Sequence, residues 1–227
     1  METRSAVEGG SAAESGNGCM RTCKASSIIQ RLALTLLAVI LSFGVAANTE
    51  ITPEALVKDT TEKVLGALEK EKELIAQDPG LIYGIVDEYI LPHFDFQRMS
   101  QRVLGKYWHR ATDEQQRKFV SQFQNLLVHT YGAALREYSD QKIEFLATRS
   151  RDDGEVSVRT QIVQGGSPPI PIQYEMYKPA GAWKIYDISI DGVSLVINYR
   201  STFAAEIRSN GVDGLIERLV KHNQQRR

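Results

Sequence analysis

The spacing of hydrophobic positions changes near residue 140. Between residues 52 and 138, apolar side chains recur every three to four positions, whereas from Ile143 to Ile190 they alternate with polar ones. A period of 3.6 residues is typical of amphipathic helices and a period of two is typical of half-buried strands. The helical period returns from Leu195 onward. Helices followed by strands and then by helices predict an α+β fold with helices packed on one face of a sheet.

Start and stop signals divide the first half of the chain into four helices. Thr52 precedes Pro53, a pair that favours a capped helix start. Thr112 and Gln115 have the spacing of a capping box. Asp95 can cap the third helix, and Pro92 and Gly105 are expected to end the second and third helices. The helices are predicted at residues 53–77, 81–91, 96–104 and 113–138.

Four runs of alternating residues predict an antiparallel meander. Asp153-Gly154 suits a hairpin turn between the first two runs. Pro171 lies inside the third run, so we expect an edge or a bulge there. The strands are predicted at residues 143–147, 156–162, 170–176 and 183–190. A sheet of this kind curls, and helices that close its concave side leave a cone-shaped cavity.

The stretch Gly181–Phe203 joins the last strand to a helix through a short corner. Asp191-Gly192 suits a sharp reversal, and Ser194 can cap a helix over residues 195–208. A final short helix is expected at residues 212–220. The space between the helix and the sheet must hold either a packed core or a pocket, and we expect a pocket.

The beginning of the chain has the layout of a secretory signal peptide. Basic residues after Met20 precede an apolar run over residues 32–45, which is followed by the small residues Ala46-Ala47. The run is short of the ~20 residues that span a bilayer. We therefore expect residues 1–47 to be a disordered extension plus a leader, with Met20 as initiator and cleavage after Ala47. An uncleaved inner-membrane anchor is the alternative.

The remaining residues, 48–227, are predicted to form one domain without cysteine. Both cysteines, Cys19 and Cys23, fall in the leader, so the domain can form no disulfide and holds no thiol nucleophile. The leader holds four of the 27 basic residues and three of the 28 acidic ones, which leaves 23 and 25 in the domain. This near-neutral balance gives no broad attraction to nucleic acid.

The sequence offers few candidates for catalytic, metal-binding or nucleotide-binding residues. The histidines of the domain share no metal-ligand spacing, and no nucleotide-binding or hydrolase motif is present. A cavity enzyme of the isomerase or hydratase kind would need a buried base, for which Asp187 and Asp87 are the candidates. We expect no catalytic residue, no metal and no cofactor. A ligand-free adaptor between envelope complexes is a further alternative.

Six groups of residues carry a resemblance to a known family. They are Phe94–Ser100, Val103–Trp108, Ala111–Gln116, Leu126–Val128 with Thr130 and Tyr131, Pro169–Ile172 with Tyr174, and Trp183–Asp187 continuing through Gly192–Leu195 to Asn198–Arg200. Together they resemble the MlaC (toluene-tolerance) family of periplasmic phospholipid-binding proteins. The pattern spans nearly all of residues 50–222 and departs from the family at His109, where Arg is expected.

The resemblance implies an α+β fold in which helices clasp a curved sheet of about four strands around a lipid cavity. It implies one phospholipid as cargo, with its acyl chains inside and its head group at the mouth. It also implies a soluble periplasmic carrier, expected to be a monomer. Such a carrier exchanges lipid between an outer-membrane lipoprotein–porin complex and an inner-membrane ABC transporter, which maintains outer-membrane lipid asymmetry.

Inward-facing positions of the strands and helices are the expected lipid contacts. Val193, at the corner before the last long helix, is the single best test, because Val193→Glu should keep the fold and lose the lipid. Lys106, Arg110 and Arg200 are weaker candidates for the mouth or a docking surface. The predicted lipid-binding residues are Val156, Val158, Ile172, Tyr174, Met176, Trp183, Ile185, Val193, Leu195 and Val196, with Leu127 and Tyr131 from the long helix.

Overall fold

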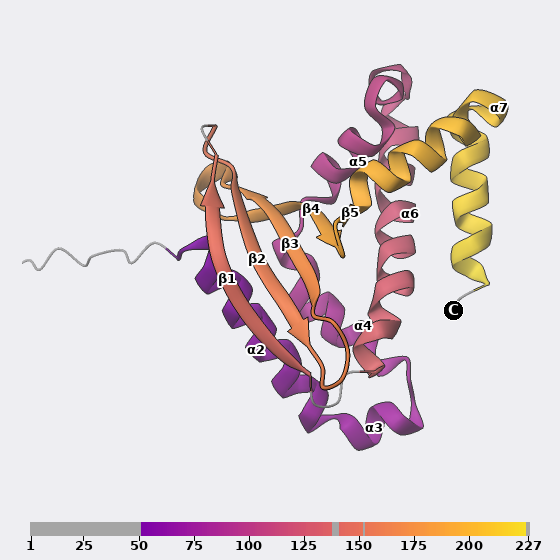
Figure 1. Cartoon of the computed structure of the whole chain (residues 1–227). Helices are drawn as coiled ribbons and strands as arrows, with labels where there is room; N and C mark the ends of the chain where they lie inside the picture. Colours follow the sequence, from indigo (N-terminus) through magenta and orange to yellow (C-terminus); the bar gives the residue numbers. More distant parts are fainter. Residues whose placement is uncertain (1–50, 138–140, 152, 226–227) are drawn as a thin grey trace, which may run out of the picture. The chain divides into compact units, whose positions relative to one another are not determined.

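Five antiparallel strands form one sheet in the order β1-β2-β3-β4-β5 (Figure 1). The structure, a computed structural model, describes residues 51–137, 141–151 and 153–225, so the signal-peptide prediction lies outside the described residues. The α+β meander is confirmed, and the sheet gains a fifth strand of two residues. The strands are β1 (Lys142–Ser150), β2 (Val156–Val163), β3 (Ile170–Tyr177), β4 (Lys184–Ile190) and β5 (Val193–Ser194).

Most helices begin at the predicted caps. The Thr52 and Asp95 side chains accept hydrogen bonds from backbone N–H groups of the first turns of α2 and α5, and Thr112 with Gln115 forms the capping box of α6. Ser194 caps α7 in the same way. The α-helices are α2 (Pro53–Lys70), α3 (Lys72–Gln77), α4 (Leu81–Ile85), α5 (Phe96–Leu104), α6 (Asp113–Tyr131) and α7 (Leu195–Gln224).

Five predicted helices differ in detail from the observed ones. The helix expected at residues 53–77 is interrupted at Glu71, between α2 and α3. The helix expected at residues 81–91 consists of α4, a π-helical turn (Val86–Ile90) and a 3₁₀ turn (Leu91–His93) before Asp95 caps α5. Helix α6 ends at Tyr131, and residues 132–137 continue as a 3₁₀ helix. The two helices predicted after residue 195 are two arms of α7, which meet at Gly211, where φ is +71°. Glycine tolerates this dihedral and permits the bend.

The prediction of an edge at Pro171 is confirmed on one side of the strand, because β4 pairs with β3 only from Ile172 onward. Strand β3 lies between β2 and β4, and Pro171 pairs with Gln161 in regular register. The Pro171 carbonyl accepts a hydrogen bond from Asp191 N, which lies just beyond the end of β4. Because the N and O atoms of a strand residue point to the same side, the missing N–H of Pro171 faces the side on which no strand pairs with it.

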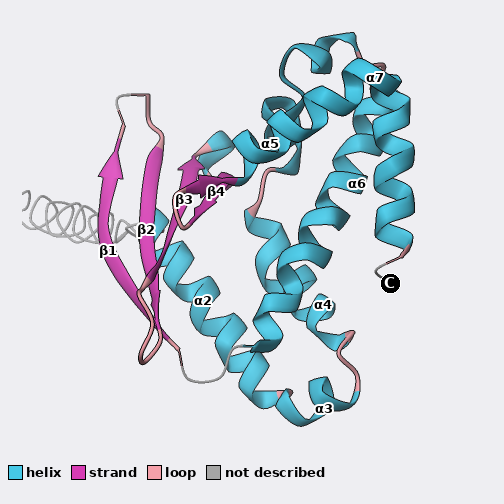
Figure 2. Ribbon diagram, turned by 45° about the vertical axis from the view of Figure 1, so that its right-hand side comes forward, coloured by secondary structure: helices cyan, strands magenta, loops and turns pink. Residues whose placement is uncertain are grey.

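The helices divide into one that runs along the sheet and a group that packs together and contacts the sheet at β4. Helix α2 runs along the sheet, whereas α5, α6 and α7 pack against one another (Figure 2). The described residues belong to one compact unit. Among the helices that the structure describes, none combines the length and the hydrophobicity needed to cross a bilayer.

Among the described residues, buried side chains form three hydrophobic cores, and Phe94 and Ile188 pack against both of the first two. The helical core joins α5, α6 and α7 and includes Phe119, Phe123 and Tyr186. The sheet core consists of Val57 from α2 with Val156, Val158, Met176 and Ile185 from the strands. A third core joins the second half of α2 to α4. The second half of α2 is therefore buried against α4, and only its first turns contribute to the sheet core.

Candidate functional site

One face of the sheet is apolar, and its residues form four rows across the strands. The strand register places Val156, Met176 and Ile185 in the first row. The second row contains Val158, Tyr174 and Ile188. The third row is Phe145, Thr160, Ile172, Ile190 and Val193, and the fourth is Ile143, Ile162 and Ile170. Since side chains alternate between faces along a strand, all four rows lie on the same side of the sheet.

The first two rows are covered. Val158 and Met176 are completely buried, and Val57 of α2 packs with them in the sheet core. Phe94 and Trp183 pack against the same core. This covered half of the face is ordinary protein interior.

The last two rows are only partly covered. Phe145 is 39% exposed, Ile170 44% and Val193 56%. Thr160, which lies between Phe145 and Ile172 in the register, is the buried exception. Among the described residues, none of the apolar side chains in these two rows belongs to or packs against any of the three cores. We call these side chains the open half of the face: Ile143, Phe145, Ile162, Ile170, Ile172, Ile190 and Val193.

The twelve residues predicted to bind lipid fall in three places. Ile172 and Val193 lie in the open half, and the sheet core contains Val156, Val158, Met176 and Ile185. Tyr174 and Trp183 are half-buried and pack against that core. Leu127, Leu195 and Val196 are buried in the helical core, and Tyr131 packs against it. Burial and the neighbouring Tyr199 hydroxyl raise the pKa of Tyr131 to about 12.

Five residues of the open half were not among the predicted lipid contacts. Ile143, Phe145, Ile162, Ile170 and Ile190 carry the same alternating signal as the residues that were selected. The alternation identifies the apolar face, but it carries no information on which end of that face a helix covers. The pairing of the strands, followed across the sheet from Ile172, identifies these five residues.

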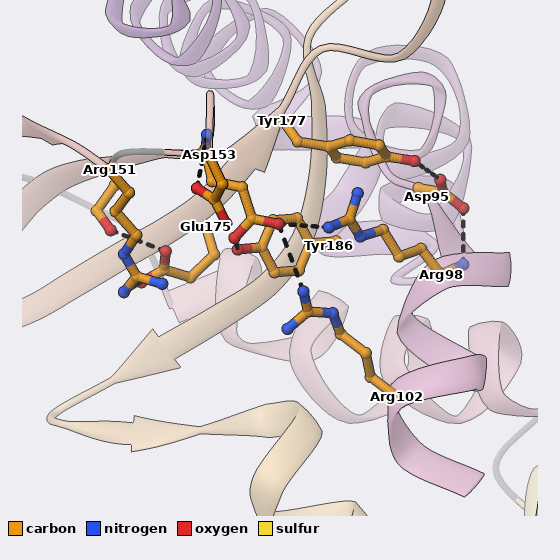
Figure 3. A network of polar contacts seen from close by, with 10 residues as sticks. Asp95, Arg98, Arg102, Arg151, Asp153, Glu175, Tyr177 and Tyr186 are labelled. Carbon is orange, nitrogen blue, oxygen red and sulfur yellow. Dashed lines mark hydrogen bonds and ion pairs between the residues drawn. The ribbon is translucent and has the colours of Figure 1, made fainter. Parts of the chain in front are cut away.

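Opposite to this face, an ion-pair network connects α5 to the sheet (Figure 3). The Glu155 carboxylate, directly before β2, accepts hydrogen bonds from the guanidinium groups of Arg98 and Arg102 in α5, the latter at 3.4 Å. The Glu155 side chain is 11% exposed. A nearly buried carboxylate needs such partners, because its charge is costly away from water.

A β-bulge delivers Tyr186 to this network. Glu175 pairs with Asp187 and Met176 with Ile185, so Tyr186 is an extra residue of β4 without a partner on β3. A bulge changes the direction of a side chain, and Tyr186 is buried in the helical core rather than on the apolar face. Its hydroxyl donates to Glu155, and burial followed by this hydrogen bond raises the pKa of Tyr186.

Arg98 lies between two tyrosine rings. Its guanidinium carbon is 3.7 Å from the ring centroid of Tyr177 and 4.5 Å from that of Tyr186. Such cation–π contacts strengthen when water is excluded. The Tyr177 hydroxyl donates in turn to Asp95, the N-cap of α5 (Figure 3). The network therefore fixes the first turns of α5 on the sheet.

The two acids that could have served as a catalytic base have other surroundings. Asp187 accepts hydrogen bonds from Ser194 Oγ at 2.5 Å and from Val196 N at 3.1 Å, so it helps to cap α7. Burial raises its pKa, opposed by these hydrogen bonds. Its register with Glu175 places it opposite to the apolar face. Asp87 is exposed on the π-helical turn. Neither carboxylate faces the open half.

Two grooves lie on the helical side of the molecule. One, of about 410 Å³, is bordered by Trp108, Gln116 and Arg117, and the other, of about 320 Å³, by Phe203, Leu215 and Arg218. None of the twelve predicted lipid-binding residues lines either groove. Within the described part of the chain, no group of three or more His, Cys, Asp or Glu side chains could hold a metal ion.

An α+β protein with a half-covered apolar sheet face belongs to the class of folds that can hold a lipophilic ligand between sheet and helices. Comparison with known families then identifies the group: the family model described as MlaC protein matches residues 58–221. This match covers more than half of the chain, and the chain belongs to the MlaC family.

Curated relatives and a solved structure agree with this assignment. The toluene tolerance protein Ttg2D of Pseudomonas putida is 31% identical over 82% of this chain and 86% of its own length. The intermembrane phospholipid transport system binding protein MlaC of Haemophilus influenzae is 28% identical over 79% of this chain and 86% of its own. A phospholipid-binding protein from Ralstonia solanacearum, solved in complex with a phospholipid, is 33% identical and has a TM-score of 0.70, covering 76% of this chain and 97% of that one.

Proposed function

We propose that this protein binds a phospholipid with its acyl chains over the open half of the apolar face and its head group toward solvent. The observation that carries the proposal is the position of seven apolar side chains on one face, outside all three cores. The related protein from Ralstonia solanacearum was solved with a phospholipid bound, which supports this choice of ligand.

The hydrophobic effect explains why such a face suits a lipid carrier. Each CH₂ group removed from water contributes ~0.8 kcal/mol, so a diacyl chain pair does not leave a membrane for water at a useful rate. A carrier must offer apolar surface that its own side chains do not already cover. The covered half of the face cannot do so without unfolding its core, whereas the open half can.

We further propose that the protein carries lipid through the periplasm. In this role it exchanges phospholipid with an outer-membrane lipoprotein–porin complex and with an inner-membrane ABC transporter, and thereby maintains the lipid asymmetry of the outer membrane. Membership of the MlaC family supports the role, as does the name of the Haemophilus relative, an intermembrane phospholipid transport system binding protein. The phospholipid is cargo, and no cofactor or catalytic step is needed.

Export would follow from the leader that the sequence predicts at residues 1–47. We propose that the carrier is the domain of residues 48–227, released by cleavage after Ala47. Mass spectrometry of the protein recovered from the periplasm should give an N-terminus at Asn48. A chain that stays in the membrane fraction with its leader attached would contradict this part of the proposal.

Lipid analysis of the purified protein tests the binding proposal directly. The protein is purified without detergent and extracted with organic solvent, and the extract is analysed by mass spectrometry. We expect phospholipid in a fixed ratio to protein, about one molecule per chain. An extract without phospholipid, together with failure to take up phospholipid from vesicles, would favour a ligand-free adaptor and overturn the proposal.

A further inference from the structure

A second surface, which adjoins the open half of the apolar face, is built where α5 meets the start of α7. Residues 96–112 contain four Arg or Lys residues and no Asp or Glu, and residues 195–205 contain Arg200 and no acid. These segments pack against each other through the α5–α7 contact (Figure 1). The concentration of positive charge is local, because the whole chain has a net charge of −1.

A close backbone approach brings the two segments together. Gly105 ends α5 with φ of +53°, and a Cβ atom at this position would lie 3.0 Å from Nη2 of Arg200. The Arg200 guanidinium therefore lies against the Gly105 backbone, next to Lys106. A side chain at residue 105 would be strained by the positive φ and would displace Arg200.

Three of these five cations, Lys106, Arg110 and Arg200, form no salt bridge with the described residues. Arg98 and Arg102 pair with Glu155 and anchor α5 on the sheet. Lys106 and Arg200 are exposed, and neither forms a salt bridge with any residue in the described ranges. The Arg102 side chain is 44% exposed, so part of its charge also reaches solvent.

Exposed aliphatic side chains border these cations. Ile197, in the first turn of α7, is 67% exposed, and Val193, four residues earlier, is 56% exposed. Arg200 follows Ile197 by three residues, which places both on neighbouring positions of the helix surface. Val193 also belongs to the open half of the apolar face. We call Arg102, Lys106, Arg200, Ile197 and Val193 the basic corner.

We propose that the basic corner docks on the surface of an anionic lipid bilayer. Cations beside exposed aliphatic groups are the composition of an interfacial membrane contact, in which the charges attract acidic head groups and the apolar groups enter the head-group layer. A standard protein interface buries about 800 Å² on each partner, whereas the apolar part of the corner consists of two aliphatic side chains. An anionic bilayer is therefore the better match.

Docking in this orientation would bring the open half of the face close to the membrane, because Val193 belongs to both surfaces. The membrane contact itself does not depend on the proposed lipid binding. It goes beyond that function by assigning a surface that would approach the source or the acceptor of the lipid.

Flotation of the purified protein with vesicles tests the proposal. Vesicles of phosphatidylethanolamine with phosphatidylglycerol are compared with vesicles of phosphatidylcholine alone. Binding is expected with the anionic vesicles at about 0.01 M salt and not at about 1 M, since the screening length falls from about 30 Å to about 3 Å. The neutral vesicles should not bind at either salt concentration.

Variants locate the contact. Each cation removed should lower partitioning about fivefold, so Lys106→Gln with Arg200→Gln should lower it roughly 25-fold. Ile197→Ser should weaken binding and keep its salt dependence. Lys142→Gln with Arg149→Gln, two exposed cations on β1 at the other edge of the sheet, removes the same charge and should have little effect.

Three results would overturn the proposal: no flotation of the unmodified protein with anionic vesicles at low salt, equal loss in the β1 control, or no loss in the Lys106/Arg200 double variant. Native mass spectrometry of the same variants separates this proposal from the proposed function. Phospholipid occupancy should be unchanged in the double variant, whereas failure of the lipid-binding proposal would appear as empty protein in every variant.

Discussion

Glu155 and Arg98 form an ion pair between the start of β2 and the first turns of α5. The pair joins the sheet to the group formed by α5, α6 and α7, and Tyr186 and Arg102 contact the same carboxylate. This relationship fixes the end of the sheet opposite to the open half. Removal of this ion pair should therefore lower the stability of the protein more than it changes lipid binding.

Glu155→Ala should destabilise the protein by about 2–4 kcal/mol, because it leaves the half-buried Arg98 without its carboxylate. Urea unfolding of the lipid-free protein measures the change. Glu114→Ala is the matched control, since its pair with Lys118 is exposed on both sides and should be worth less than about 1 kcal/mol. Equal effects of the two substitutions would show that the network contributes no more than a surface pair.

Val193→Glu should leave the fold intact and abolish the copurifying phospholipid. Val193 is already 56% exposed, so the stability cost should be within about 0.5 kcal/mol. The new carboxylate would lie on the row of Ile172 and Ile190, and an acyl chain placed there would have to bury an unpaired charge. Native mass spectrometry measures the occupancy.

Leu74→Glu is the control for that experiment. Leu74 in α3 is 55% exposed, which matches Val193, and it lies outside the strands. It should keep full lipid occupancy. If Val193→Glu also keeps it, the third row of the apolar face does not contact the ligand.

The two halves of the apolar face should differ in their contribution to stability. Met176→Ala removes a completely buried side chain of the sheet core and should cost about 2–5 kcal/mol. Ile170→Ala, at a position that is 44% exposed, should cost less than about 1 kcal/mol in lipid-free protein.

When phospholipid is bound, the stability costs of Met176→Ala and Ile170→Ala should become more similar. Acyl chains that cover Ile170 would make its truncation more costly, and the melting temperature of the loaded variant should fall accordingly. A cost at Ile170 that is the same with and without phospholipid would indicate that the ligand binds elsewhere.

The free energy of unfolding should decrease as the pH rises through the pKa of the Asp187 carboxyl in the folded protein. Burial raises the pKa of Asp187 above its value in the unfolded chain, so the folded state binds the proton more tightly. The favourable contribution is fully present below the unfolded pKa of about 3.9 and disappears as the pH rises through the folded value. The difference in unfolding free energy between the unmodified protein and Asp187→Asn should therefore decrease with rising pH. Urea unfolding at a series of pH values measures this difference. A difference that grows toward neutral pH would contradict the predicted effect of Asp187 on stability.

Local signals of the sequence anticipated the starts of four helices. Thr52, Asp95, Thr112 and Ser194 cap the helices that follow them. These predictions succeed because a cap is a contact between residues three positions apart. The π-helical turn after α4 and the 3₁₀ end of α6 were missed. At Gly132, near the end of α6, the Tyr83 ring lies 3.4 Å from the position that a Cβ atom would occupy, a long-range contact that no local pattern shows.

The sequence alone determined the element types, the apolar face of the sheet and, through the resemblance, the family, because alternation and capping act between near neighbours. Only the tertiary structure decided which rows of that face are covered, since coverage depends on Val57 reaching Val158 from a distant helix. It likewise decided that Tyr186 lies in the helical core, because one extra residue in β4 turns that side chain away from the apolar face.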